Sequence, residues 1–149
     1  MSTAVADDPL ALDRQVCFAL YAASRAVTAA YRPLLEPLGL TYPQYLVMLV
    51  LWERGTLAVG DVGAALHLDS GTLSPLIKRM EAAGLVERRR SADDERRVLV
   101  ALTTEGRGLR ERAIEIPGRI VEAARVDPEA LALVRRACEA LLGVEPRPR

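Results

Sequence analysis

The sequence predicts a mainly α-helical fold with one small β-hairpin. Half of its 149 residues are hydrophobic, which is enough apolar mass for a packed core. Apolar residues recur at helical spacing through most of the chain. Two segments rich in Val, Leu and Arg, 85–90 and 97–102, instead flank a polar stretch, as the two arms of a hairpin do. The length fits one domain, or a core with a small appendage, so we treat residues 1–149 as a single chain unit.

The first half of the chain predicts two long helices. The first covers 9–30, where Leu12, Val16, Leu20 and Val27 repeat at helical spacing, and Arg32-Pro33 is expected to break or kink it. The second covers 44–54, with Thr41 or Tyr42 near its cap, Pro43 in its first turn and Gly55 at its end. It is apolar nearly all round, which predicts that it is buried.

A winged helix-turn-helix is predicted over 43–103. A short helix at 59–66 is followed by the turn 67–69 and a further helix at 70–83. Asp69 and Ser70 are the candidate N-caps of that helix, and Gly84 is its stop. The hairpin with its tip at 91–95 follows directly and supplies the wing.

The C-terminal part predicts two more helical segments. Thr103 and Thr104 can cap a fifth helix, which Pro117-Gly118 is expected to interrupt, and Asp127-Pro128 opens a last helix. We expect 10–36 and 104–142 to form a helical dimerisation region. The ends, 1–8 and 144–149, are expected to be disordered tails.

Composition excludes several classes of protein. The 20 basic and 20 acidic residues cancel, so the chain is no polybasic binder, and a nucleic-acid surface would require local segregation of charge. Aromatic residues make up 4%, too few for stacking single-stranded bases. Two cysteines and one histidine favour neither a disulfide scaffold nor a metal site. With no membrane span or secretory signal in view, we expect a cytoplasmic protein without metal or cofactor.

The predicted recognition helix and wing carry the residues suited to reading DNA. Hydroxyls and cations near a helix N-terminus can meet base edges and phosphates. The candidate DNA-binding residues are Asp69, Ser70, Thr72, Ser74, Pro75, Lys78 and Arg79 on the helix, and Arg88, Arg90 and Arg96 on the hairpin. The alternative is an ordinary solvated hairpin with a charged surface.

The wing leads to a known family. The run Asp94-Glu95-Arg96-Arg97-Val98, ending in Leu102-Thr103, resembles the wing signature of MarR-type regulators. The segments 16–25, 40–48 and 68–73 look like those of the organic hydroperoxide resistance repressors (OhrR), and the likeness covers about residues 10–117. The resemblance implies an obligate dimer in which Arg96 enters a minor groove and Asp94 braces the hairpin.

A polar stripe on the first helix contains a candidate thiol sensor. Cys17, Tyr21, Ser24, Thr28 and Tyr31 are spaced 4, 3, 4 and 3 residues apart, which places them on one face. The alternative is that Cys17 is a small core residue. Tyr31 lies about 21 Å along a straight helix from its own Cys17 and cannot reach it. It could reach Cys17 of a second chain if the two first helices cross antiparallel at a twofold axis.

The resemblance assigns roles within that stripe. It implies that Cys17 is the reactive cysteine and that Tyr31 and Tyr42 contact Cys17 of the partner subunit, with Tyr21 as a further wall of the sensor pocket. OhrR relatives with a resolving cysteine carry it near 120–122, where this chain has none. Cys138 shares an apolar face with Leu131, Val134 and Leu141, which favours burial in a helical interface.

The resulting hypothesis is a homodimeric repressor rather than an enzyme. It would bind a pseudo-palindromic operator in double-stranded DNA and release it when an organic hydroperoxide oxidises Cys17, with a small thiol available to form a mixed disulfide. Two alternatives remain. One is a MarR-type regulator that responds to a non-covalent small aromatic or anionic ligand, and the other is a thiol peroxidase, in which the winged helix would be idle.

Overall fold

The computed structural model describes residues 8–143 in two compact units, one ending at Ile114 and the other beginning at Glu115. Each unit is described by itself. The predicted tails lie outside the described residues, apart from Asp8. Within the described part, no helix by itself has the length and apolar composition of a membrane span, and Val16–Leu38 with Tyr42–Arg54 passes that test only as a pair bent by 70°.

The first long helix begins later and ends later than the sequence predicts. A short 3-10 turn, η1 (Leu12–Arg14), precedes α1 (Val16–Leu35), because Gln15 is extended and separates the two. Of the two effects expected of Pro33, a break or a kink, the break is absent, because α1 continues through Pro33. Pro33 lacks the N–H that would donate to the carbonyl four residues before it, and the helix ends two residues after it, at Leu35. The chain then turns through η2 (Glu36–Leu38) and Gly39, whose φ is +68°.

Helix α2 (Tyr42–Arg54) confirms the second predicted helix, including its cap. The Thr41 side chain accepts a hydrogen bond from the Gln44 backbone N–H, and the Gln44 side chain accepts one from the Thr41 N–H. This reciprocal capping box satisfies two backbone donors at the helix start. Gly55, with φ +73°, follows the last turn and its N–H donates to the Leu51 carbonyl. Tyr45, Val47, Met48, Val50 and Leu51 of α2 are buried, but Leu49 is 39% exposed, so the prediction of a helix buried nearly all round holds only in part.

The helix-turn-helix lies where it was predicted. Helix α3 (Val59–Leu66) ends at His67, which adopts the left-handed conformation with φ +54°. Helix α4 (Ser70–Ala82) starts after Asp69, whose Oδ1 accepts the Thr72 N–H at 2.8 Å. Gly63 is required at this turn, because a Cβ there would lie 2.7 Å from the Leu68 carbonyl oxygen.

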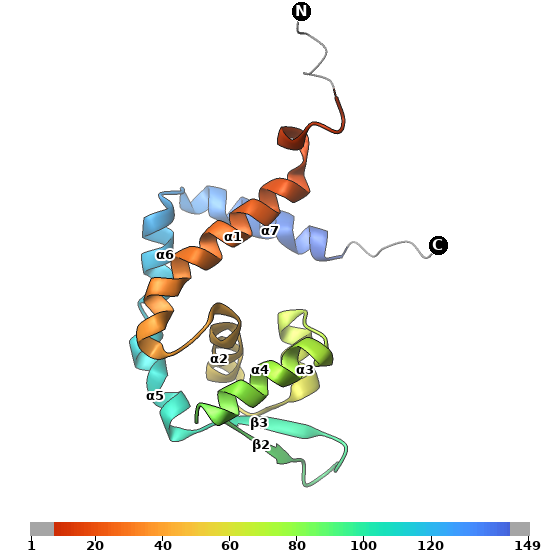
Figure 1. Cartoon of the computed structure of the whole chain (residues 1–149), viewed down its shortest axis with the longest axis vertical. Helices are drawn as coiled ribbons and strands as arrows, with labels where there is room; N and C mark the ends of the chain where they lie inside the picture. Colours follow the sequence, from red (N-terminus) through yellow and green to blue (C-terminus); the bar gives the residue numbers. More distant parts are fainter. Residues whose placement is uncertain (1–7, 144–149) are drawn as a thin grey trace, which may run out of the picture. The chain divides into compact units, whose positions relative to one another are not determined.

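The predicted hairpin is present as β2 (Val86–Arg90) and β3 (Val98–Leu102), paired antiparallel from Val86–Leu102 to Arg90–Val98. Figure 1 shows β2 following the C-terminal end of α4, with the hairpin running back below that helix. A third strand, β1 (Leu57–Ala58), pairs with β3 on its other side and gives the order β1-β3-β2. Sequence periodicity missed β1, because two residues are too few to show alternation.

Helix α5 (Thr104–Ala113) is capped by Thr103, as expected, and contacts both β3 and α2. The Trp52 indole N–H donates to the Gly106 carbonyl at 3.0 Å, which ties α5 to α2. The first unit is held by one apolar core, drawn from α1, α2, α3, α4 and the sheet. Its fully buried side chains include Leu35, Tyr45, Met48, Leu51, Val62, Leu73, Ile77, Met80, Val86 and Val100.

The second unit contains α6 (Ile116–Ala124) and α7 (Pro128–Leu142). Pro117 does not interrupt the fifth helix as predicted. The chain has already left α5 at Ile114, and Pro117 lies in the first turn of α6, where its missing N–H costs nothing. Asp127 caps α7 by accepting the Glu129 N–H, in agreement with the prediction.

Candidate nucleic-acid interface and thiol site

Helix α4 separates an apolar face from a polar one. Leu73, Leu76, Ile77 and Met80 are buried in the core. The predicted DNA-binding residues of this helix all have exposed side chains: Asp69, Ser70, Thr72, Ser74, Pro75, Lys78 and Arg79. The backbone and side chain of Thr72 donate hydrogen bonds that lower the pKa of Asp69, so this cap is ionised at neutral pH.

A groove of about 500 Å³ lies between the helix-turn-helix and the wing. Its walls come from α3, α4, β2 and the start of β3. Among its lining residues are Asp61, Ser70, Ser74, Arg88, Arg96 and Arg97. Hydroxyls and guanidinium groups on facing walls are the donors that bind a phosphodiester backbone.

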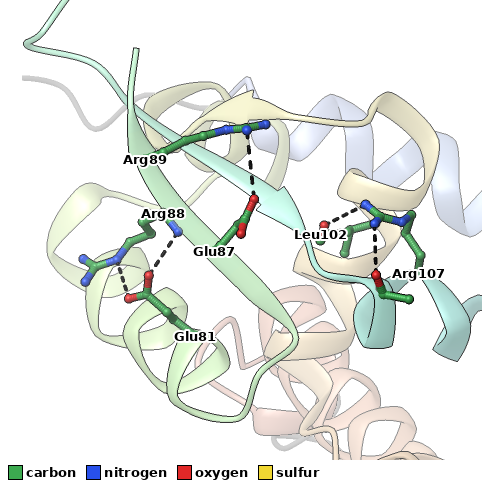
Figure 2. A network of polar contacts seen from close by, with 7 residues as sticks. Glu81, Glu87, Arg88, Arg89, Leu102 and Arg107 are labelled. Carbon is green, nitrogen blue, oxygen red and sulfur yellow. Dashed lines mark hydrogen bonds and ion pairs between the residues drawn. The ribbon is translucent and has the colours of Figure 1, made fainter. Parts of the chain in front are cut away.

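The cations at the base of the wing are partly occupied by neighbouring carboxylates. Figure 2 shows Arg88 on β2 reaching Glu81 on α4, and Arg89 reaching Glu87. The Arg88 N–H donates to Glu81 Oε1 at 3.0 Å and its Nε to Oε2 at 2.9 Å. These bonds from Arg88 lower the pKa of Glu81. Within residues 8–143, the guanidinium groups of Arg90 and Arg96 have no hydrogen bond or ion pair, so they are available to a ligand.

The wing tip is closed by hydrogen bonds around Asp94. Asp94 Oδ1 accepts the Arg96 N–H at 3.0 Å, and its carbonyl accepts the Arg97 N–H at 2.9 Å. This is the geometry that a brace of the hairpin requires. The Arg97 guanidinium lies 2.9 Å from Asp61 on α3. Sequence reasoning missed Asp61, because no local spacing marks an ion pair between residues 36 positions apart.

Cys17 is exposed on α1 in the single chain, so its own subunit does not bury it as a core residue. Tyr21, one turn further along, is 60% exposed, and the Arg25 guanidinium lies 5.6 Å from its ring centroid. The Thr28 hydroxyl donates to the Ser24 carbonyl. These side chains of the polar stripe therefore lie on a face of α1 that the first unit leaves open.

The last residue of the stripe belongs to a cluster of three tyrosines. The ring centroid of Tyr31 lies 4.7 Å from that of Tyr42 and 5.7 Å from that of Tyr45. Burial raises the pKa of both Tyr31 and Tyr42, and Tyr42 adds to the effect on Tyr31, so both phenols are protonated at neutral pH. Burial, with the neighbouring phenols, raises the pKa of Tyr45 to about 12. The sequence indicated Tyr45 only as a buried residue of a helix.

A second groove of about 500 Å³ opens beside this cluster. Its lining comes from the end of α1, the η2 turn and the start of α2. The residues are Thr28, Arg32, Glu36, Gly39, Leu40, Thr41, Tyr42 and Pro43. The groove thus places polar side chains next to the Tyr42 ring, with Thr28 of the stripe among its walls.

Cys138 lies on α7 in the second unit and is half-buried there. Its neighbours on the apolar face, Val134 and Leu141, are 54% and 42% exposed. The burial predicted for Cys138 is therefore only partial within its own chain. Among residues 8–143, no three His, Cys, Asp or Glu side chains are grouped so that they could hold a metal ion.

Comparison with known proteins places these features in a family. A family model described as transcriptional regulator SarA/Rot matches residues 29–112. The organic hydroperoxide resistance transcriptional regulator of Bacillus subtilis is 50% identical over 135 residues, which cover 91% of this chain and 92% of that protein. The regulator TtmR of Methylorubrum extorquens is 55% identical over 117 residues, 78% of this chain and 60% of that protein.

Solved structures of other regulators share the fold of this chain. The structure of reduced AbfR bound to DNA superposes with a TM-score of 0.75 at 33% identity, covering 87% of this chain and 91% of that one. BpsR of Bordetella bronchiseptica, with a TM-score of 0.82 at 24% identity, covering 93% of this chain and all of that one, shares the fold.

A helix-turn-helix followed by an antiparallel hairpin, together with these matches, defines a winged-helix transcriptional regulator. The chain belongs to the MarR superfamily, in its group of organic hydroperoxide resistance regulators. Its relatives are transcriptional regulators and not enzymes, which confirms the prediction that the chain is no peroxidase.

Proposed function

We propose that this protein is a homodimeric repressor that senses organic hydroperoxides through Cys17 and then releases its operator. The DNA-binding part rests on the open polar face of α4 and on the guanidinium groups of Arg90 and Arg96, which are unpaired within residues 8–143. The proposed contacts are those of the recognition helix, Asp69 to Arg79, in the major groove and of Arg96 in a minor groove, with Asp94 holding the wing tip.

Dimerisation is supported by apolar side chains that the single chain leaves exposed. On and before α1 these are Leu10, Leu12, Val16, Phe18 and Val27, and on α7 they are Leu133, Val134, Leu141 and Leu142. Exposed apolar surface of this extent marks an interaction site. We assign 10–36 and 104–142 to the dimer interface. Two recognition helices related by a twofold axis would read a pseudo-palindrome with half-sites about 10 bp apart.

The observation that carries the sensing proposal is the convergence of Tyr31 and Tyr42 at 4.7 Å, with Cys17 exposed on the same helix as Tyr31. Fourteen helical residues separate Cys17 from Tyr31, about 21 Å, so these phenols would serve Cys17 of the partner subunit. Because both phenols are protonated, each can donate a hydrogen bond to a thiolate and stabilise it. Tyr21 would form a further wall.

The chemistry begins with attack of the Cys17 thiolate on the terminal oxygen of the hydroperoxide. The O–O bond breaks, the alkoxide takes up a proton and leaves as an alcohol, and the sulfur keeps one oxygen as sulfenic acid. A small thiol can then condense with the sulfenic acid, releasing water and leaving a mixed disulfide. Cysteine is oxidised by two electrons and the hydroperoxide is reduced by two.

The larger, polar sulfur group would no longer fit against the tyrosine cluster. The two α1 helices would shift, the recognition helices would lose their one-turn spacing and DNA would be released. The neighbour AbfR is described in reduced, overoxidized and disulfide-formed states, at 33–34% identity, which supports redox control in this fold.

The test is release of DNA by an organic hydroperoxide. A duplex selected from a random library by the reduced wild-type protein serves as the probe. Cumene hydroperoxide should release wild-type protein from this duplex, and Cys17→Ser should bind the duplex but ignore the peroxide. Release of the Cys17→Ser protein by peroxide would refute the sensing role of Cys17.

A second candidate function is response to a non-covalent small aromatic or anionic ligand. The groove beside Tyr42, which includes the Arg32 side chain, is the observation that favours it. Such a regulator would release DNA equally well as wild type and as Cys17→Ser when its ligand is added. The two candidates therefore differ in the behaviour of one variant.

A further inference from the structure

The wing is joined to the helix-turn-helix by one ion pair on each of its arms. On the β2 arm, Glu81 of α4 holds both the backbone and the side chain of Arg88 (Figure 2). On the β3 arm, Asp61 in the first turn of α3 holds the Arg97 guanidinium at 2.9 Å. Each arm is thus fixed to a different helix of the helix-turn-helix.

Arg97 is also the residue that closes the wing tip. Its N–H donates to the Asp94 carbonyl, and its own carbonyl accepts the Ser91 N–H, both at 2.9 Å. Arg96, the neighbouring residue, has its backbone N–H bound to the Asp94 carboxylate. A force that holds Arg97 therefore also holds the backbone from which the Arg96 side chain extends.

The position of Asp61 is unexpected for a DNA-binding surface. Its carboxylate lines the groove between α4 and the wing, together with Ser70, Ser74 and Arg96. A negative charge in a groove that receives a phosphate backbone opposes binding. Asp61 therefore lowers the affinity for DNA unless its contact with Arg97 raises that affinity by more than the repulsion lowers it.

We propose that Asp61 is a positioning residue for DNA binding: by holding Arg97 it sets the distance of the wing tip, and so of Arg96, from the recognition helix. This inference rests on the proposed DNA-binding function. The Arg97 and Asp61 side chains are 53% and 56% exposed, so the pair is worth little by itself. A dimer has two wings, and a substitution that removes the Asp61–Arg97 pair would release both of them.

The direction in which one substitution changes the DNA affinity separates a positioning role of Asp61 from a purely electrostatic one. Asp61→Asn removes a negative charge from the groove, so a purely electrostatic role predicts tighter DNA binding. Positioning predicts weaker binding, by about three- to fivefold for each wing and about nine- to twenty-fivefold for the dimer. The slope of log Kd against log salt should stay at the wild-type value, because no cation is removed.

Asp93→Asn is the matched control. Asp93 lies at the wing tip, and its carboxylate forms no ion pair with any residue from 8 to 143. The substitution removes the same charge without releasing Arg97, and it should leave binding unchanged or tighten it. Binding of both variants to the selected duplex is measured by fluorescence anisotropy at several salt concentrations.

A double-mutant cycle with Arg97→Gln completes the test. If Arg97 acts through Asp61, Arg97→Gln weakens binding in the wild type but adds almost nothing in the Asp61→Asn background. An equal loss in both backgrounds, with a lower salt slope, would mean that Arg97 contacts phosphate directly, and would overturn the proposal. Tighter binding by Asp61→Asn would overturn it too. If the wild type selects no duplex at all, the proposed function itself fails.

Discussion

The rings of Tyr31 and Tyr42 lie 4.7 Å apart, although Tyr31 belongs to α1 and Tyr42 is the first residue of α2. The η2 turn and Gly39 reverse the chain between them, and the capping box at Thr41 fixes where α2 begins. Two phenol hydroxyls are thereby brought to one place by local backbone geometry. This juxtaposition gives the sensing proposal its sharpest test.

Tyr31→Phe and Tyr42→Phe should each slow the alkylation of Cys17 by iodoacetamide at neutral pH. Loss of a hydrogen bond to a thiolate lowers its population, and about tenfold is the expected effect. Tyr45→Phe is the control, because Tyr45 shares the cluster but is 1% exposed and cannot reach another subunit. Equal alkylation rates in the wild type and the three variants would mean that the tyrosines serve only in packing.

Cys17 and Cys138 should differ fully in function. Cys17 is exposed among hydroxyl-bearing side chains, whereas Cys138 is half-buried on an apolar face of α7. Cys138→Ser should retain peroxide-triggered release from DNA. After treatment with cumene hydroperoxide and cysteine, peptide mass spectrometry should find the added thiol on Cys17. A stoichiometric Cys17–Cys138 disulfide would contradict this prediction.

The wing arginines should contribute unequally to DNA binding. Arg96 is free of any partner within the described residues, so Arg96→Ala should weaken binding and lower the salt slope by about one for each phosphate that is no longer neutralised. Arg88 already shares its charge with Glu81, so Arg88→Ala should change the salt slope less. Titrations at several salt concentrations give both slopes. A larger change of the salt slope for Arg88→Ala than for Arg96→Ala would contradict the assignment of the minor-groove contact to Arg96.

The tyrosine cluster should make stability fall in alkali. The pKa of Tyr45 is raised from 10.0 to about 12, so folding favours its neutral form. The unfolded chain loses this proton first as the pH rises, and the stabilisation present below pH 10 disappears between pH 10 and about 12. Thermal melting of wild type and Tyr45→Phe across this range checks the sign. The variant should lose less stability than the wild type over the same interval.

Sequence reasoning found the elements whose signals are local. Asp69 before α4, Thr103 before α5 and Asp127 before α7 each cap the helix that they were expected to cap. It misjudged the two prolines, because the effect of a proline depends on its distance from a helix end. Pro33 lies in the last turn of α1, which continues past it to Leu35, and Pro117 lies in the first turn of α6, where a missing N–H costs nothing.

The contacts that build the site were less predictable, since they join residues far apart in the sequence. Arg88 was expected to bind DNA, and the structure pairs it with Glu81, which the sequence did not indicate. Asp61 carried no signal, because its partner is 36 residues away. Tyr45 was recognised as buried, yet its place beside Tyr31 depends on how α1 returns to α2. Hydrophobic periodicity identifies which face of a helix is buried, but it does not identify which other element packs against that face.

The single tryptophan gives this regulator a built-in optical signal. The Trp52 ring stands 6.4 Å from Tyr45, which in turn contacts Tyr31 and Tyr42, and its indole N–H is bound to the backbone of α5. The tryptophan emission of the protein therefore originates one aromatic ring away from the phenols assigned to the thiol. A change of packing at those phenols would alter energy transfer from tyrosine to tryptophan. The kinetics of oxidation could thus be followed in unlabelled protein, in real time and without DNA.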